Sequence, residues 1–288
     1  MNSFSNITTY AVISDVHGNY KALETFLHYC TQNSIVGIIG LGDYMTDSPY
    51  PERMIALMKQ MKEQYPCYFV RGNRENYLIN NERKNQRWKP SSQSGCLYYT
   101  AQHLSQSDIA FLESMPEEKS LSLECLPDLY ICHGLPGNVC GNVNAEPELR
   151  ELALQTIPGD YLLGGHSHKQ ELFYWNDKIY LNPGSLGYSL DGMGGNIQFA
   201  LMHGDKNTNK WETELISIPY DANSFLQDFT ESGLDEIGFV LNRAVKKTII
   251  TGINYVLKCV SMAQQKTGLP LHLVAEDTWE EIAQELDL

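Results

Sequence analysis

Residues 9–19 of the chain read TYAVISDVHGN. The first part of this stretch, Thr9 to Ser14, is an apolar run that predicts a buried strand. Asp15 and His17 follow directly at its carboxyl end, and Asn19 is a typical N-cap for a helix that runs to about Thr31. The stretch therefore predicts a strand that passes into a helix, with two potential metal ligands in the connection between them.

The same order repeats twice downstream. Val36–Gly40 is a second apolar run that leads to Asp43, and Pro51 then opens another helix, in whose first turn proline is tolerated. Cys67–Val70 is a third run and ends shortly before Asn73. Because strands and helices alternate and the strands are apolar throughout, we expect a parallel sheet that is covered on both faces.

Two further motifs follow apolar runs, Cys132-His133-Gly134 and Gly164-Gly165-His166-Ser167-His168. Each motif by itself is ordinary, because Gly-Asp and Gly-Asn are common turn dipeptides and a single buried histidine is usually a core residue. Together they place oxygen and nitrogen ligands, without thiolate, at the ends of strands, and this set suits a pair of Mn, Fe or Zn ions. The candidate ligands are Asp15, His17, Asp43, Asn73, His133, His166 and His168.

The order and spacing of these motifs, from about Ala11 to Ser185, resemble the calcineurin-like metallophosphoesterase superfamily. The resemblance implies an α/β (α+β) fold in which a two-sheet β-sandwich is flanked by helices. It also implies two divalent metal ions as cofactors, with manganese favoured over iron and zinc. On this basis we expect a metal-dependent phosphoric ester hydrolase.

The resemblance also assigns a role to each ligand. Asp15, His17 and His168 would hold one metal ion, Asn73, His133 and His166 the other, and Asp43 would bridge both. A bridging carboxylate holds two cations roughly 3.5–4 Å apart, where they can share one hydroxide that attacks phosphorus in line with the leaving oxygen. The expected catalytic residues are Asp43, Asn73, Arg74 and His133.

Arg74 departs from the commonest pattern of the family. Many relatives carry histidine after Gly-Asn in the third motif, and that histidine helps to protonate the leaving alkoxide; this chain reads Arg71-Gly72-Asn73-Arg74-Glu75. An arginine stays protonated and is a poor general acid, but it can bind phosphoryl oxygens bidentately. The alternative is a salt bridge to Glu75 or another acid, and the sequence leaves the two roles open.

A finer resemblance concerns Asn182-Pro183-Gly184-Ser185, which follows a predicted strand. It resembles the small bacterial phosphodiesterase branch, which includes proteins similar to diadenosine-polyphosphate hydrolases. We therefore expect hydrolysis of phosphodiester or phosphoanhydride bonds in a small phosphorylated substrate such as a dinucleoside polyphosphate. The alternatives are a phosphomonoesterase that acts on a small metabolite or phosphoprotein, and a non-catalytic scaffold stabilised by metal.

The later apolar runs lie close together, and Asn176-Asp177-Lys178 between two of them indicates a hairpin turn. We therefore expect these runs to form a second, largely antiparallel sheet. A short helix is predicted over 108–115. The strands are predicted over 121–124, 129–132, 161–163, 172–175, 179–181, 197–202 and 211–216.

From Pro219 onward the pattern is helical, with segments over 221–230, 234–264 and 278–286 and a capping box at Thr278-x-x-Glu281. We divide the chain into a catalytic domain, residues 1–220, and a helical C-terminal extension, residues 221–288, packed on it. The extension is rich in apolar residues, so it should cover the domain, shape access to the site or form a homodimer contact. His272 is isolated and is interpreted as structural.

Composition limits the class of function. The formal net charge of −14 argues against a long nucleic-acid partner, because affinity for such partners comes mainly from Lys and Arg on phosphates. No apolar run is long enough to cross a bilayer, and Met1–Thr9 lacks the features of a secretory signal, so no membrane partner is expected. Seven scattered cysteines without a C-x-x-C pair indicate reduced thiols and a cytoplasmic protein.

Overall fold

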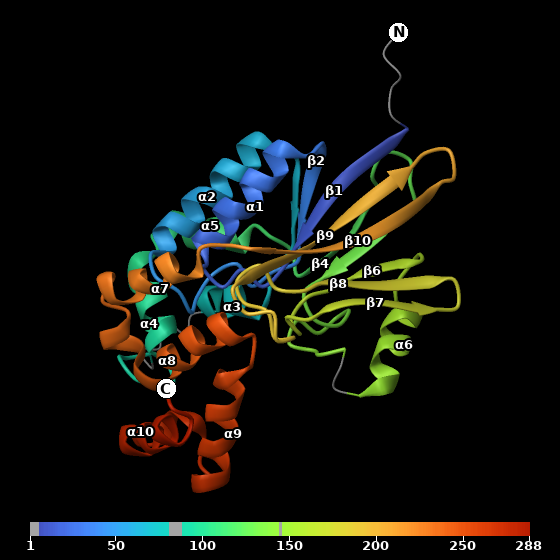
Figure 1. Cartoon of the computed structure of the whole chain (residues 1–288). Coiled ribbons are helices and arrows are strands. Elements are labelled where there is room, and N and C mark those ends of the chain that lie inside the picture. The colour runs from blue at the N-terminus through green and yellow to red at the C-terminus, as the bar shows by residue number, and fades with distance from the viewer. Residues whose placement is uncertain (1–5, 81–87, 144–145) are drawn as a thin grey trace.

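The computed structural model describes residues 6–80, 88–143 and 146–288. In this part of the chain two β-sheets pack face to face, and helices lie against their outer faces (Figure 1). The architecture is a two-sheet sandwich of the α/β (α+β) class, as the sequence predicts. The last helices of the chain lie together at one end of the molecule, away from the start of the first strand (Figure 1).

The first sheet has the strand order β10-β9-β1-β2-β3. β1, β2 and β3 run parallel, whereas β9 runs antiparallel to both β1 and β10. The strands of this sheet are β1 (Ile7–Ile13), β2 (Ile35–Gly40), β3 (Cys67–Phe69), β9 (Asn196–Asp205) and β10 (Lys210–Pro219).

The second sheet has the strand order β4-β5-β6-β8-β7. Its three central strands, β5, β6 and β8, are parallel, and the edge strands β4 and β7 are antiparallel to their neighbours. The strands of this sheet are β4 (Glu118–Leu121), β5 (Leu129–Cys132), β6 (Tyr161–Leu163), β7 (Gln170–Trp175) and β8 (Lys178–Pro183).

Helices α1 and α2 cover the first sheet and α6 packs on the second, whereas α7 to α10 follow the last strand (Figure 1). A short 3-10 turn spans Leu271–Leu273. The α-helices are α1 (Tyr20–Gln32), α2 (Pro51–Gln64), α3 (Asn73–Ile79), α4 (Gly95–His103), α5 (Gln106–Glu113), α6 (Pro147–Thr156), α7 (Ala222–Glu231), α8 (Asp235–Thr251), α9 (Tyr255–Thr267) and α10 (Glu276–Glu285).

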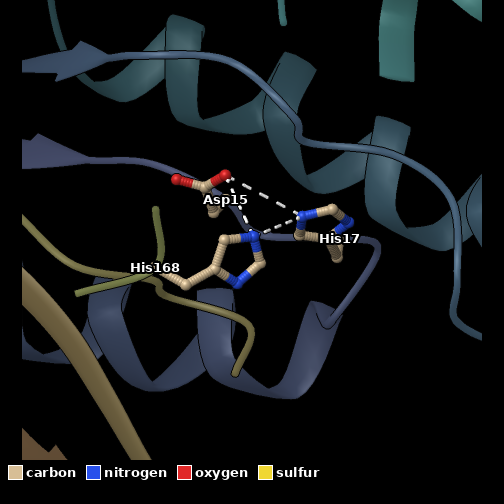
Figure 2. Close-up of side chains that lie close together, drawn as sticks. All are labelled: Asp15, His17 and His168. Carbon is tan, nitrogen blue, oxygen red and sulfur yellow. Dashed lines mark hydrogen bonds and ion pairs between the residues drawn. The ribbon is translucent and has the colours of Figure 1, made fainter. Parts of the chain in front are cut away.

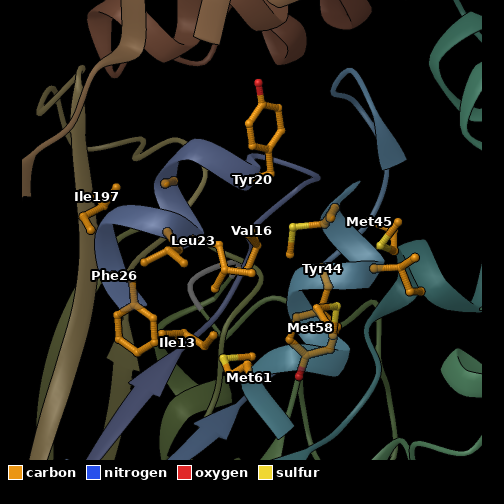
Figure 3. Close-up of a cluster of buried hydrophobic side chains, with 14 of the residues drawn as sticks. Ile13, Val16, Tyr20, Leu23, Phe26, Tyr44, Met45, Met58, Met61 and Ile197 are labelled. Atoms are coloured by element: carbon orange, nitrogen blue, oxygen red, sulfur yellow. The ribbon is translucent and has the colours of Figure 1, made fainter. Parts of the chain in front are cut away.

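Both faces of β1 are buried from Tyr10 to Ile13, which explains why this part of the strand is apolar. Successive side chains of a strand point to opposite faces. Tyr10 and Val12 belong to the cluster between the two sheets. Ile13 points the other way and packs with Leu23 and Phe26 of α1 beneath the helices (Figure 3). The strand therefore links the two main cores and carries Asp15 and His17 out at its carboxyl end.

The prediction of a largely antiparallel second sheet is wrong in two respects. Its central strands are parallel, because the chain between β5 and β6 contains α6 and crosses back in the same direction. In addition, β9 and β10 belong to the first sheet, where β9 pairs with β1. The hairpin at Asn176 and Asp177 is confirmed between β7 and β8, where Trp175 pairs with Lys178.

Several local expectations also need correction. The strand expected over 121–124 is β4 at Glu118–Leu121, an edge strand that buries only Leu121 and so shows no apolar run. The sequence analysis does not predict α3, α4 and α6, which are short helices of 7, 9 and 10 residues. Thr278 and Glu281 lie inside α10, which begins at Glu276, and so form no capping box.

The C-terminal helices share a core with the sheets. Phe225 and Phe229 of α7 are fully buried in the cluster beneath α1, and the ring of Phe225 lies 5.7 Å from that of Tyr20. A separate cluster joins α8, α9 and α10 around the buried Trp279. The expected continuous helix over 234–264 is divided into α8 and α9 at Gly252, which has a φ of 67°. The domain boundary at residue 220 remains a prediction.

Among the described residues, no helix is both long and apolar enough to span a membrane.

Phe225→Ala should lower the free energy of unfolding by about 3–5 kcal/mol, because it leaves a cavity in a core shared by α7 and α1. Urea denaturation measures the loss. Leu269→Ala, at a position that is 45% exposed, is the control and should change stability by less than about 0.5 kcal/mol. A Phe225→Ala protein as stable as this control would mean that the C-terminal helices do not support the sheets.

Candidate metal centre

The structure brings the predicted ligands together at one end of the sandwich. Each follows the carboxyl end of a strand: β1 precedes Asp15 and His17, β2 precedes Asp43, and β3 precedes Asn73. In the second sheet, β5 precedes His133 and β6 precedes His166 and His168. Because β1, β2 and β3 are parallel, as are β5 and β6, their carboxyl ends meet at one edge and the loops converge.

Asp15, His17 and His168 form the first group of potential ligands (Figure 2). His168 Nε2 lies 3.2 Å from Asp15 Oδ1 and 3.1 Å from His17 Nε2. His17 Nε2 lies 3.9 Å from the same Asp15 oxygen. The three donor atoms thus point toward one another from loops far apart in the sequence (Figure 2).

Asp43, His133 and His166 form the second group. His133 Nε2 lies 3.3 Å from Asp43 Oδ2 and 3.2 Å from His166 Nδ1. Asp43 Oδ2 is also 3.8 Å from His17 Nε2 of the first group. One carboxylate oxygen of Asp43 therefore stands between the two groups, the place that the resemblance assigns to a bridging ligand.

Hydrogen bonds on the far side of the imidazole rings fix their orientation. The Nδ1 atom of His17 lies 3.0 Å from Asp47 Oδ2, and that of His133 lies 2.8 Å from the Leu41 carbonyl. His168 Nδ1 lies 3.0 Å from the carbonyl of Tyr188. Each of these rings can donate its Nδ1 hydrogen outward and so present an Nε2 lone pair to the centre, as metal-binding histidines usually do.

The donor atoms fit divalent cations. The Oδ1 atoms of Asp15 and Asn73 are buried without a hydrogen-bond partner, although buried acceptors are rarely left unpaired. The other oxygens are engaged: Asp15 Oδ2 accepts from the His166 amide at 2.9 Å and Asp43 Oδ1 from the Arg74 amide at 2.8 Å. The free oxygens and imidazole nitrogens form a set that suits Mn, Fe or Zn.

The two buried carboxylates make the centre attractive to positive charge. Burial raises the pKa of Asp15 and of Asp43, but the neighbouring imidazoles outweigh it and hold both pKa values below the ordinary range. Burial lowers the pKa of His133, yet Asp43 and Asp15 raise it to about 10. Cation binding would therefore displace a proton from His133.

The loops that carry the ligands hold an uncommon backbone. Asp15, His17, Asp43, His166 and His168 have positive φ values of 52°, 48°, 53°, 68° and 56°. Non-glycine residues rarely adopt this left-handed region, and those that do cluster at functional sites. These residues adopt an unfavourable backbone conformation at the positions where their side chains meet, which is typical of a functional site.

A model of the calcineurin-like phosphoesterase superfamily domain matches residues 9–207, more than half of the chain. The chain belongs to this superfamily. Members hydrolyse phosphoesters with divalent metal ions, so the protein is a metal-dependent phosphoester hydrolase.

This phosphoesterase is similar to several proteins at low sequence identity. The chain is 24% identical over 250 residues to an uncharacterized protein of Methanocaldococcus jannaschii, an alignment that covers 78% of this chain and 93% of the relative. It shares its fold with a metallophosphoesterase from Sphaerobacter thermophilus, with 18% identity, a TM-score of 0.65 and coverage of 85% of this chain and 100% of the other. It also shares its fold with a hypothetical protein from Pyrococcus horikoshii, with 18% identity, a TM-score of 0.71 and coverage of 85% of this chain and 98% of the other.

Arg74 pairs with an acid, but not with Glu75. Its Nη2 lies 3.1 Å from Oδ2 of Asp47, the same carboxylate oxygen that orients His17. Arg74 nevertheless lines the cavity of the phosphoesterase site beside His17, Asp43 and Asn73. The guanidinium of Arg74 therefore forms a salt bridge and at the same time lines the cavity of the metal centre.

Three residues with structural roles at the site are missed by the sequence analysis. Asp47 orients His17, the Tyr188 carbonyl orients His168, and the buried Glu75 accepts hydrogen bonds from the loop of Asp43. Glu75 has a local signal, since it occupies the third position of α3, where a glutamate side chain can accept from the N-cap amide, here that of Gly72 at 2.8 Å. Asp47 and Tyr188 have none, because tertiary packing alone brings them to the histidines.

Asp43→Asn should lower metal binding at both positions, because one bridging charge serves both cations. Elemental analysis should find two metal ions per wild-type chain and fewer than one in this variant, while His168→Ala should lose one preferentially. Circular dichroism should show both variants folded, since these ligands lie on loops.

The control for this experiment is Asp177→Asn, in the exposed hairpin turn, which should keep two metal ions per chain. Unchanged stoichiometry in Asp43→Asn would contradict the bridging role. Global unfolding of His168→Ala would mean that this histidine is a packing residue.

Proposed function

We propose that this phosphoesterase hydrolyses phosphodiester or phosphoanhydride bonds whose leaving groups are already stable anions, with nucleotides such as dinucleoside polyphosphates as substrates. The observation that carries the proposal is Arg74, which lines the metal cavity where many relatives carry histidine. An arginine cannot protonate a leaving alkoxide, whereas it binds phosphoryl oxygens well.

The role of the leaving group follows from general acid catalysis. A proton donor is typically worth about 10²–10⁴-fold in rate, and it matters most for an alkoxide of high pKa. A nucleotide phosphate or a phenolate leaves as a stable anion near neutral pH and needs no proton. A site with arginine in place of the acid should therefore favour these substrates.

The segment Asn182 to Ser185 supports the proposed likeness to the small bacterial phosphodiesterase branch. The Asn182 carboxamide donates to the Gly165 carbonyl at 2.8 Å, and the Ser185 hydroxyl donates to the Asp15 carbonyl at 2.7 Å. Both bonds brace loops that carry potential ligands. The Asn182 to Ser185 motif therefore helps to hold the loops of the potential ligands in place.

We propose the ligand sets that the resemblance implies: Asp15, His17 and His168 for one cation, Asn73, His133 and His166 for the other, and Asp43 for both. Bound there, two divalent cations, manganese favoured, supply Lewis acidity and a water whose pKa is lowered toward neutral. The chain itself orients the imidazoles, excludes bulk water through burial of the acids, and offers the Arg74 guanidinium to a phosphoryl oxygen.

Release of 4-nitrophenolate from bis(4-nitrophenyl) phosphate and from 4-nitrophenyl phosphate tests the proposal, each with added Mn and with chelator. We expect hydrolysis of the diester with Mn and its loss with chelator. Dominant monoester hydrolysis would instead favour a phosphomonoesterase of small metabolites or phosphoproteins. Silence with both substrates would favour a metal-stabilised scaffold and contradict the proposal.

Arg74→Ala should raise the KM for substrates with additional phosphates by about 10- to 150-fold, since a charged bidentate contact is worth roughly 1.5–3 kcal/mol. The wild-type rate should depend steeply on leaving-group pKa across a series of substituted phenyl phosphodiesters. Arg74→His should partly restore activity on alkyl esters if its imidazole reaches the leaving oxygen.

Arg243→Ala provides a matched control, because Arg243 also forms an ion pair, with Glu280, on the C-terminal helices. It should leave the leaving-group dependence unchanged. If Arg74 served only to pair with Asp47, Arg74→Ala would lose stability and keep the same ratio of rates between good and poor leaving groups.

We also propose a cytoplasmic location and an association of two chains through the C-terminal helices. The first rests on the cysteines, all seven of which are unpaired in the structure. The second rests on exposed apolar side chains of α8 and of the turn that follows it, among them Ile250 and Ile253. Sedimentation of the full chain measures the association.

A further inference from the structure

The cavity at the metal centre has two walls of different chemistry. It has a volume of about 250 Å³, and the candidate ligands form one wall. The facing wall is apolar except for one carboxamide and comes from the loop between β8 and β9 and from the start of α9. Its residues are Leu190, Asn254, Val256, Leu257 and Val260.

We propose that this facing wall holds the organic group of the substrate, and that this group has a flat apolar face with polar edges, as a nucleoside does. The inference rests on the proposed phosphoesterase function and assigns the surface that would recognise the organic group of its substrate. A small polar phosphomonoester would fill only the metal side and leave Leu190, Val256 and Leu257 facing water. Ligand sites usually combine such an apolar lining with a few placed polar groups.

The wall is fixed in place by backbone hydrogen bonds. The Gly192 amide donates to the Gly252 carbonyl at 3.1 Å, and the Gly195 amide donates to the Ile249 carbonyl at 2.9 Å. A Cβ atom on Gly194 would collide with the Ile250 carbonyl, so only glycine permits this close approach. The β8–β9 loop and the turn from α8 to α9 therefore form one surface, and the wall exists before a ligand arrives.

Tyr188 joins this surface to the metal side. Its ring lies 4.9 Å from the ring of His17 and 4.8 Å from that of His168. Behind Arg74 a smaller cavity of about 70 Å³ shares Tyr188 and Val256 with the main one, and its lining includes Leu241 and Val245 of α8. An organic group bound beside the phosphorus can thus contact apolar side chains from α8 and α9.

The polar groups on this surface favour a nucleoside over a plain alkyl chain. The carboxamide oxygen of Asn254 accepts from the Leu257 amide at 2.8 Å, which leaves the carboxamide nitrogen to donate to a ligand. Gln93 offers a second carboxamide in the smaller cavity. An alkyl chain would leave these groups without partners, whereas the edges of a base or sugar can bond to them.

Two esters with the same leaving group test the inference: thymidine 5′-(4-nitrophenyl) phosphate and methyl 4-nitrophenyl phosphate, hydrolysed by the Mn-loaded full chain. We expect the wild type to prefer the thymidine ester at least tenfold in kcat/KM. Leu257→Gln should reduce that preference about three- to tenfold, mainly by raising the KM for the thymidine ester. Leu257 is 57% exposed, so this variant should fold.

Leu269→Gln is the matched control, since Leu269 is also an exposed leucine of the C-terminal segment, at 45%, and lies outside the lining of both cavities. It should keep the wild-type preference. Equal kcat/KM for the two esters, or a preference that Leu257→Gln does not alter, would overturn the inference while leaving the phosphoesterase function intact. A higher kcat/KM for octyl 4-nitrophenyl phosphate than for the thymidine ester would also overturn the inference and would indicate that the surface binds a hydrocarbon group.

Binding provides a readout that does not depend on turnover. Calorimetry of the Mn-loaded chain should show tighter binding of thymidine 5′-monophosphate than of inorganic phosphate, and Leu257→Gln should reduce the difference. If neither ester is hydrolysed but this difference appears, the proposed function fails and the binding surface stands. If the two ligands bind equally, the binding surface is refuted.

Discussion

The carboxylate of Glu75 fixes the loop after β2 against the start of α3, and the metal centre depends on this contact. Glu75 is fully buried, and its two oxygens accept four backbone N–H groups at 2.8 to 3.1 Å, those of Gly72, Asp43, Tyr44 and Met45. Burial and the nearby Asp43 carboxylate raise the pKa of Glu75 to about 7, although the hydrogen bonds from backbone amides act in the opposite direction. Asp43 and Asn73 are thereby held at a fixed separation although they follow different strands.

Backbone hydrogen bonds join the loop after β1 to this unit and join the loops after β5 and β6 to each other. The Asp15 and His17 amides donate to the carbonyls of Gly42 and Asp43 at 3.0 and 2.9 Å, and the Gly165 amide donates to the His133 carbonyl at 2.7 Å. These bonds between loops explain how so many non-glycine residues keep a left-handed backbone. A Cβ atom on Gly72 would collide with the carboxylate of Asp43, and one on Gly165 would collide with the side chain of Ser14. Glycine at these two positions therefore allows the loops to pack closely against each other.

The sequence predicts the half of the fold in which strand and helix alternate, together with the candidate ligands, because each ligand lies within a few residues of the end of an apolar run. It does not predict that β9 joins β1, since pairing between strands so far apart leaves no local pattern. Nor does it predict that Arg74 pairs with Asp47, because a long side chain has several acids within reach and packing decides among them.

The candidate ligands all lie between residues 15 and 168, whereas the wall that faces them comes from residues 190 to 260. The two parts are therefore under different mutational constraints. We expect substitutions in the ligand loops to be costly, because several of their residues have positive φ values, whereas Leu257 of α9 is exposed, lies in no strand and is not a candidate ligand. Substitutions in α9, by natural selection or in a designed library, can thus change which organic group the enzyme binds while the metal ligands stay the same.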